Sequence, residues 1–332
     1  MIACPLLAGA PPDVAVVIPT YRRAALLQRC LQAVCAQRLP GRRFEVIVVD
    51  DGRDEDTRAQ VLGYAAQEAR ASIRYLRPGN GKGPAAARNA GWHSTRAPVI
   101  AFTDDDTIPA VDWLAEGLGA MTEGVDALAG ALRVPIPNPC TDHQWNTYGL
   151  ERAEFVTANA FVRREALERV GGFDERFTRA WREDSDLQFS LLEAGCRIAR
   201  CPRAVVVHPV RAERWGVSLR QQRNAMFEAL LYKKHPDLYR ARIRRRPPLA
   251  RYGLVAAALA APGLVLAGHL TAALACALVT AGGIGRIAAA RLRHTDRSAR
   301  HVTEMVVTSC AIPFLSVYWR VRGSLQHRIF FL

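Results

Sequence analysis

Short apolar runs alternate with amphipathic stretches along the first hundred residues. The apolar runs are rich in β-branched residues, which is typical of buried parallel strands. We expect strands at residues 14–18, 45–49, 73–76 and 99–103. In the intervening segments, apolar residues recur at helical spacing. We expect helices at residues 26–35, 57–70 and 85–90. This alternation predicts an α/β domain with a doubly wound, mostly parallel sheet and right-handed crossovers.

Aspartates follow two of the expected strands. Asp50 and Asp51 come after the second strand, and Asp104, Asp105 and Asp106 come after the fourth. The carboxyl ends of parallel strands meet at the sheet edge where open α/β proteins bind ligands, and unpaired carboxylates are too costly for the core. Clustered carboxylates suit Mg²⁺ or Mn²⁺, which often also contacts substrate phosphates. The alternative is an aspartate-rich turn that caps helices.

The turn at residues 19–22 ends the first strand at the same edge. A nucleotide suits this arrangement, with Pro19 or Tyr21 against the base, Arg22 in the same turn, and Asp51 on the base or ribose. Neither GxGxxG nor GxxxxGK[ST] follows the first strand, which disfavours a dinucleotide-binding fold and a P-loop.

Eight short blocks, in order, resemble the conserved segments of family-two glycosyltransferases of the GT-A fold. They are residues 16–21, 48–52, 87–91, 102–106, 158–167, 170–175, 183–187 and 206–208. The resemblance spans about residues 14–208 and indicates a membrane-associated bacterial type. It implies a metal-dependent, inverting, hexosyltransferase-like enzyme that uses a UDP-, GDP- or dTDP-sugar.

The resemblance also implies roles for four residues. Asp104 and Asp106 frame a DxD motif, in which Asp106 is the better candidate for the direct metal ligand and Asp104 also reaches the ribose. His208 completes the metal site, although an ordinary histidine at the end of a strand is the alternative. Asp184 is the general base that deprotonates the acceptor hydroxyl. Acids in a first helical turn can also simply complement the helix dipole.

Three further residues are candidates for donor binding. Lys82 and Arg88 are placed to hold phosphate oxygens, or they are ordinary solvated charges. Asn159 is a candidate contact of the donor sugar.

The net charge of +14 is unevenly distributed. Residues 249–332 contain nine arginines, no lysine and two acids, a net charge of +7. Because these arginines flank apolar runs and do not alternate with aromatic residues, they favour an anionic membrane over a nucleic acid. The eight cysteines form no CxxC or zinc-type spacing, which indicates reduced thiols in the cytosol. Residues 1–12 lack the basic start of a signal peptide.

The C-terminal third predicts membrane-associated helices. Residues 252–285 contain no charged residue and are flanked by arginines on both sides. Because arginine-rich flanks of membrane segments usually stay in the cytosol, both ends of this segment are expected there, as in a helical hairpin. A buried, alanine-rich helix pair is the alternative. The expected organisation is a tail (1–12), a GT-A catalytic domain (13–212), a basic amphipathic interface helix and linker (213–248), a hydrophobic hairpin (249–290), and a basic loop with an interfacial helix (291–332).

These observations together predict a glycosyltransferase at the cytosolic face of the cell inner membrane. It would move one sugar to a lipid-linked, saccharide or other hydroxyl acceptor in glycan, polysaccharide or glycolipid biosynthesis, with membrane lipids as partners and no nucleic acid. The QxxRW signature of processive synthases is absent, which favours single-sugar transfer. The alternatives are a nucleotidyltransferase and a catalytically silent nucleotide-sugar-binding membrane scaffold.

Overall fold

The computed structural model describes residues 11–68, 71–79 and 81–331. The chain forms two compact units, which are described separately. The sheet unit comprises Met1–Pro135 and Leu150–Pro209, and the helical unit comprises Ile136–Gly149 and Val210–Leu332. Most of the expected N-terminal tail, including Cys4, and the end of the helix expected at residues 57–70 lie outside the described residues.

The sheet unit contains all the strands and helices expected in the first hundred residues, within three residues of the predicted bounds. Its strands are β1 (Val14–Thr20), β2 (Phe44–Asp50), β3 (Ala71–Leu76), β4 (Val99–Phe102), β5 (Ile108–Pro109), β6 (Ala127–Arg133), β7 (Ala160–Arg163) and β8 (Ile198–Val207). Its helices are α1 (Ala24–Cys35), α2 (Glu55–Gln67), α3 (Pro84–His93), α4 (Trp113–Ala120), α6 (Arg164–Val170) and α7 (Glu183–Glu193), with a 3₁₀ turn η2 (Thr157–Asn159). A further 3₁₀ turn, η1 (Gly149–Arg152), links the units in sequence.

The strands form one sheet in the order β3-β2-β1-β4-β7-β6-β8-β5. The first four strands of this order are parallel, as the alternation of strands and helices predicts. Strand β7 is antiparallel to both β4 and β6, and β8 is parallel to β6. Two reversals cancel, so β8 runs in the same direction as β4. The sequence did not anticipate this mixed half of the sheet.

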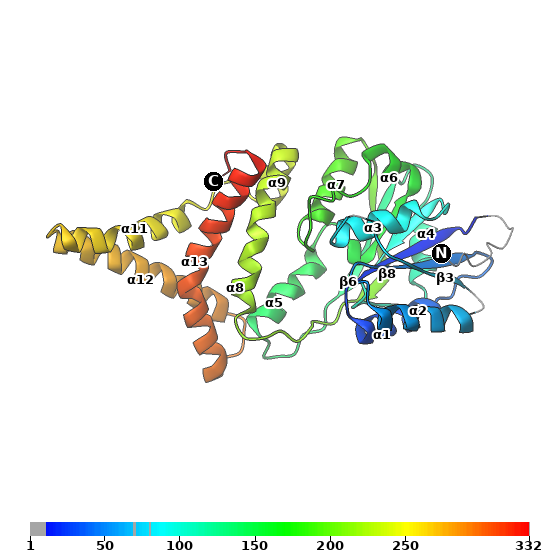
Figure 1. The fold of residues 1–332 in the computed structure, drawn as a ribbon, viewed down its shortest axis with the longest axis horizontal. Helices are drawn as coiled ribbons and strands as arrows, with labels where there is room; N and C mark the ends of the chain where they lie inside the picture. The colour runs from blue at the N-terminus through cyan, green and yellow to red at the C-terminus, as the bar shows by residue number, and fades with distance from the viewer. Residues whose placement is uncertain (1–10, 69–70, 80, 332) are drawn as a thin grey trace. The chain divides into compact units, whose positions relative to one another are not determined.

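Helices cover both faces of the sheet (Figure 1). One apolar cluster joins α1, α2 and α4 to the sheet, and the other joins α3, α6 and α7 to its opposite face. Alternate residues of β1 serve the two clusters, as with Val16 and Val17. A Cβ atom on Gly91 of α3 would lie 2.4 Å from Cγ1 of Val17, so glycine lets this helix lie close against the strand.

The helical unit contains the remaining elements. They are α5 (Asp142–Tyr148), α8 (Val217–Gln221), η3 (Gln222–Ala225), α9 (Met226–Lys234), α10 (Pro236–Leu238), a π-helical turn η4 (Tyr239–Ile243), α11 (Leu249–Leu266), α12 (Leu270–Leu292) and α13 (Ala299–His327). Helices α11 and α12 pack against each other as a hairpin (Figure 1). Arg291, near the end of α12, pairs with Asp142 of α5 and donates hydrogen bonds to Ser218 and Thr308, which ties four elements together.

One expectation for this unit needs correction. The amphipathic helix expected within residues 213–248 is divided into α8, η3 and α9. All six residues 226–231 of α9 are buried, and α9 packs against α13, so it is a packed helix without a free apolar face. Helix α13 has 29 residues and contains the segment expected as an interfacial helix, whose position at a membrane stays a prediction.

Three helices are long and apolar enough to cross a membrane, namely α11, α12 and α13. Only 11% of the most apolar window of α11, and of that of α12, is buried within the chain, compared with 33% for α13. The seven cysteines that the structure describes are all free thiols.

Candidate active site

The site lies at the sheet edge where β1, β2, β4 and β8 end. Strand β1 pairs in parallel with β2 and β4, so the segments after these three strands emerge together. Because β8 runs in the direction of β4, the residue after β8, His208, emerges at the same edge. The tertiary structure therefore brings a histidine to aspartates that lie about a hundred residues earlier in the chain.

Asp104, Asp106 and His208 form a compact cluster. Each offers one ligand atom, and these atoms lie within 4.8 Å of one another. Nε2 of His208 lies 3.7 Å from Oδ1 of Asp106, and both side chains are largely buried. Nδ1 of His208 is also buried and has no hydrogen-bond partner among the described residues. Two carboxylates and an imidazole are ligands that Mn²⁺ accepts, and the carboxylates also suit Mg²⁺. The donor set thus fits a divalent cation.

Asp105, the middle aspartate, points away from this cluster and holds two strand ends together. Its Oδ2 accepts a 2.8 Å hydrogen bond from the Thr20 hydroxyl at the end of β1. Its Oδ1 pairs with Arg23 at 3.3 Å. Burial raises the pKa of Asp105 to about 6. The sequence assigned no role to this residue because a run of three acids does not reveal which side chain faces inward.

A buried arginine connects the cluster of Asp104, Asp106 and His208 to the start of α7. Nη2 of Arg88 lies 2.7 Å from Oδ1 of Asp104, and Nη1 lies 3.1 Å from Oε1 of Glu183. Only 2% of Arg88 is exposed, so the alternative of an ordinary solvated charge is wrong, and its contact with phosphate oxygens stays a prediction. In the described structure the guanidinium positions two carboxylates. Arg88 follows three buried alanines on α3, whose small side chains let the helix lie close to the sheet.

Glu183 is a site residue whose burial the sequence did not reveal. Its Oε2 is buried without a hydrogen-bond partner among the described residues, and burial raises its pKa to about 7. Acids in the first turn of a helix usually face solvent, so sequence position alone does not indicate burial.

Asp184, the expected base, lies next to Glu183 in the first turn of α7. Its Oδ1 accepts a 2.7 Å hydrogen bond from the backbone N–H of Ser185, which orients the carboxylate. Burial raises its pKa, and the negative charge of Asp104 adds to this rise. Arg182 immediately before α7 has a left-handed backbone with φ of 75°. Trp181 is 41% exposed beside it and presents a ring surface.

Residues expected to contact a nucleotide lie on the segments after β1, β2 and β3. Tyr21 is 52% exposed, and the Arg22 guanidinium lies 5.6 Å from its ring centroid. Pro19 is half-buried at the end of β1. Oδ2 of Asp51 accepts a 2.9 Å hydrogen bond from the backbone N–H of Gly83, and the neighbouring Lys82 is exposed. These five residues therefore lie on segments that reach the same edge of the sheet.

Asp50 stabilises the loop after β2 by hydrogen bonds to its backbone. It is fully buried, its two oxygens accept hydrogen bonds from the backbone N–H groups of Gly52 and Asp54, and the Tyr75 hydroxyl adds a third. These contacts shape the turn that carries Asp51.

The side chain of Asn159, expected at the donor sugar, makes its hydrogen bonds within the sheet unit. The residue is fully buried. Its Nδ2 donates hydrogen bonds to the carbonyl oxygens of Ala131 and Ala204, and its Oδ1 accepts one from Trp113 Nε1. It joins β6, β8 and α4, and both polar atoms of its side chain form hydrogen bonds in the described structure.

The sheet order indicates the class of fold. The mostly parallel sheet, with aspartates after β4 and a histidine after β8, agrees with the GT-A fold that the sequence blocks predict. Comparison with solved structures supports the same fold. Mannosyltransferase PcManGT from Pyrobaculum calidifontis, in complex with GDP-Man and Mn²⁺, superposes with a TM-score of 0.59 at 22% identity, and the match covers 95% of this chain and 90% of that chain. GalNAc-T7 with UDP, GalNAc and Mn²⁺ gives a TM-score of 0.50 at 14% identity over 68% of this chain and 51% of that chain.

Sequence comparisons identify the family. Residues 15–171 match the model of glycosyl transferase family 2, and residues 99–289 match that of glycosyl transferase family group 2. Glycosyltransferase AglE of Haloferax volcanii is 31% identical over 57% of this chain and 68% of its own length. Pre-mycofactocin glycosyltransferase of Mycobacterium tuberculosis is 32% identical, and the match covers 68% of this chain and 48% of that relative. The chain belongs to glycosyl transferase family 2 and is a glycosyltransferase.

Proposed function

We propose that this glycosyltransferase is metal-dependent and inverting, and that it transfers one sugar from a nucleotide sugar to an acceptor hydroxyl at the cytosolic face of a membrane. The observation that carries the proposal is the convergence of Asp104, Asp106 and His208 at one sheet edge. The electrostatic influence of Asp104 on Asp184 supports a base close to this cluster.

Asp104, Asp106 and His208 would hold Mg²⁺ or Mn²⁺. When bound, the cation would supply electrostatic stabilisation of the negative charge on a departing diphosphate. The two solved relatives of this fold contain Mn²⁺ with GDP-Man or with UDP, which supports a nucleotide-sugar donor. The ion pair with Arg88 would keep Asp104 in position.

The nucleotide would lie over the loops after β1 and β2. Tyr21 and Pro19 would pack against the base, and Asp51 would accept a hydrogen bond from the base or ribose. Arg22 and the exposed Lys82 would attract the phosphates by charge.

Asp184 would remove the proton of the acceptor hydroxyl as its oxygen attacks the anomeric carbon. The new bond joins the acceptor oxygen to that carbon, and the bond from the carbon to the diphosphate oxygen breaks. Attack opposite the leaving nucleoside diphosphate inverts the anomeric configuration. Partial burial helps Asp184 in this role, because a raised pKa makes a carboxylate a stronger base.

The three apolar helices support a location at a membrane. The arginines on both sides of the α11–α12 hairpin favour a cytosolic orientation of the catalytic unit, as at a cell inner membrane. A lipid-linked acceptor is consistent with this location, and a saccharide or another hydroxyl compound is equally consistent with the residues of the site.

The test is donor-dependent release of nucleoside diphosphate by the full-length protein in mild detergent. A panel of UDP-, GDP- and dTDP-sugars is incubated with membrane lipid extract, with Mn²⁺, Mg²⁺ or EDTA. We expect release that EDTA abolishes, and NMR of the product should show the anomeric configuration opposite to that of the donor. Direct Mn²⁺ binding, followed by electron paramagnetic resonance, should weaken at least tenfold in Asp106→Asn.

Asp184→Asn should retain Mn²⁺ binding and lose more than a hundredfold in the rate of transfer, because a general base contributes about 10²–10⁴. Asp112→Asn is the matched control, since Asp112 is exposed and its side chain caps no helix. Release of pyrophosphate would indicate a nucleotidyltransferase instead. Tight donor binding without turnover in any extract would indicate a silent sugar-nucleotide sensor.

A further inference from the structure

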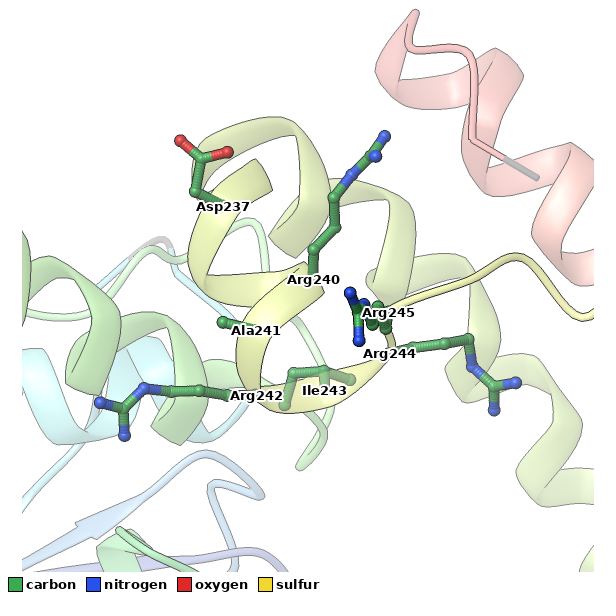
Figure 2. Close-up of a pocket in the computed structure, with 7 residues that line it drawn as sticks. All are labelled: Asp237, Arg240, Ala241, Arg242, Ile243, Arg244 and Arg245. Atoms are coloured by element: carbon green, nitrogen blue, oxygen red, sulfur yellow. The ribbon is translucent and has the colours of Figure 1, made fainter.

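A turn rich in arginine precedes α11 in the helical unit. Arg240, Arg242, Arg244, Arg245 and Arg246 lie within seven residues, and all five are exposed. The first four line an open hollow of about 650 Å³ around the π-helical turn η4, together with Asp237, Ala241 and Ile243 (Figure 2). We name residues 239–246 the arginine turn.

The arginine turn is anchored at its first residue. Tyr239 is almost fully buried, and its hydroxyl donates a 2.6 Å hydrogen bond to Oε2 of Glu228 on α9. Its ring packs edge-on against Tyr232 and Phe331. The start of the arginine turn is thus anchored in the core of the helical unit.

Positive charge in this region exceeds the negative charge around it. Arg244, Arg245 and Arg246 form no ion pair in the part of the chain that the structure describes. Only one acid, Asp237, lines the hollow. The charges of Arg244 and of the buried Arg320 on α13 both repel Arg251 on α11. Within the described residues, Nε and Nη2 of Arg320 are buried without hydrogen-bond partners. Several donors here therefore lack an anionic acceptor.

The arginine turn leads directly into an apolar, exposed helix. Pro247 and Pro248 separate Arg246 from α11, and leucines such as Leu249 and Leu259 are 65% and 71% exposed. A cationic turn followed at once by an exposed apolar helix matches the two parts of a lipid, a charged headgroup and acyl chains.

We propose that the arginine turn binds the phosphate groups of anionic phospholipids at the membrane surface where α11 begins. Arg240 and Arg242 point in different directions, so the donors are spread over a surface and do not converge on a single phosphate (Figure 2). A layer of headgroups presents phosphates in this spread form. The exposed part of the turn carries no aromatic side chain for base stacking, which disfavours single-stranded nucleic acid. This proposal extends the proposed membrane location and does not depend on sugar transfer.

The experiment measures lipid binding by the full-length protein in neutral detergent micelles. Trace amounts of fluorescent phosphatidylglycerol or phosphatidylcholine are titrated with protein, and binding is followed by fluorescence anisotropy. We expect the wild type to prefer phosphatidylglycerol by at least tenfold at low salt, and 0.5 M NaCl should largely remove the preference. Equal binding of the two lipids would overturn the proposal but leave the membrane location and the transferase activity intact.

The variant Arg244→Gln/Arg245→Gln/Arg246→Gln removes three arginines whose side chains make no ion pair in the described structure, so it should fold normally. We expect at least a tenfold loss of phosphatidylglycerol binding, since each arginine close to an anionic surface contributes roughly fivefold. The matched control is Arg29→Gln/Arg38→Gln/Arg42→Gln, which removes the same charge from exposed positions of the sheet unit. An equal loss in the control would show a general charge effect and refute the site.

Two competitors identify the source of the phosphate. Inorganic phosphate at 10 mM should leave phosphatidylglycerol bound, because one small anion contacts few of the spread arginines. Displacement by inorganic phosphate would show a free-phosphate site instead of a headgroup site. Displacement by a short single-stranded RNA at lower concentration than the lipid would identify a nucleic-acid surface and also overturn the proposal.

Discussion

The buried ion pairs of Arg88 allow a quantitative test of how the active site is held together. We consider Arg88→Met, which keeps most of the side-chain volume against the ring of Phe173 but removes the charge. Asp104 and Glu183 then lose their shared counter-charge. The Asp104 side chain is 27% exposed and can be solvated, whereas that of Glu183 is only 5% exposed. The cost therefore falls mainly on Glu183.

Removal of one partner from a buried pair typically costs about 3–5 kcal/mol. We expect about 3 kcal/mol for Arg88→Met, because Glu183 can take up a proton. This corresponds to a fall in Tm of roughly 6–12 °C for a unit of this size. Without Arg88, the pKa of Glu183 should rise above its present value of about 7. A carboxyl group whose pKa is higher in the folded than in the unfolded state lowers stability as pH rises toward the folded value. The destabilisation should therefore be larger at pH 8 than at pH 6.

The assay is thermal unfolding in mild detergent, followed by circular dichroism and calorimetry at both pH values. The double variant Arg88→Met/Glu183→Gln should recover about 1–2 kcal/mol, since it no longer buries an unpaired charge. Arg58→Met is the control, because the Arg58–Glu55 pair is exposed and screened by solvent, so its removal should leave Tm nearly unchanged. A cost below 1 kcal/mol for Arg88→Met, or a double variant no more stable than the single one, would refute the reasoning.

Three further predictions concern the packing beneath the site, and all are measured as changes in the free energy of unfolding. Asn89→Ala should cost about 3 kcal/mol or more, because the Asn89 side chain makes four hydrogen bonds, and three of their partner groups stay buried after the substitution. A cost near 1 kcal/mol would show that water replaces these hydrogen bonds. Gly91→Ala should cost about 1–3 kcal/mol, since its Cβ would overlap Val17, and Ala90→Ser on the same helix is the control. Thr20→Val should cost about 1–3 kcal/mol through the lost hydrogen bond to Asp105, and Thr20→Ser should restore most of it; equal losses in the two would exclude the hydroxyl as the cause.

Local patterns were sufficient for the elements of the first hundred residues and for the carboxylates at the strand ends. Apolar runs and helical periodicity depend on neighbours in sequence, so β1, β2, β3 and β4 could be placed within three residues. The second half of the sheet could not be derived in this way. The strand β7 inserts antiparallel between β4 and β6, and no local pattern specifies which distant strand pairs with it.

The same difference between local pattern and tertiary pairing applies to the site residues. Aspartates after β4 and the histidine after β8 are visible as strand endings, and only pairing through β7 and β6 shows that they meet. The sequence could not reveal that Arg88 and Asn159 are buried, because burial depends on distant parts of the chain. In the folded chain Arg88 of α3 pairs with Glu183 of α7, and Asn159 forms hydrogen bonds with β6, β8 and α4.

For this protein, residue types and their periodicity determined the class of fold, the strand endings that carry acids, and the apolar helices that follow. These properties are local, because they depend on side chains a few positions apart. Only the tertiary structure decided that Asp104 and Asp106 meet His208, that Glu183 is buried against Arg88, and that Asp105 holds β1 to β4. Each of these depends on which distant groups lie within hydrogen-bond reach, and that distance is set by strand order and helix packing.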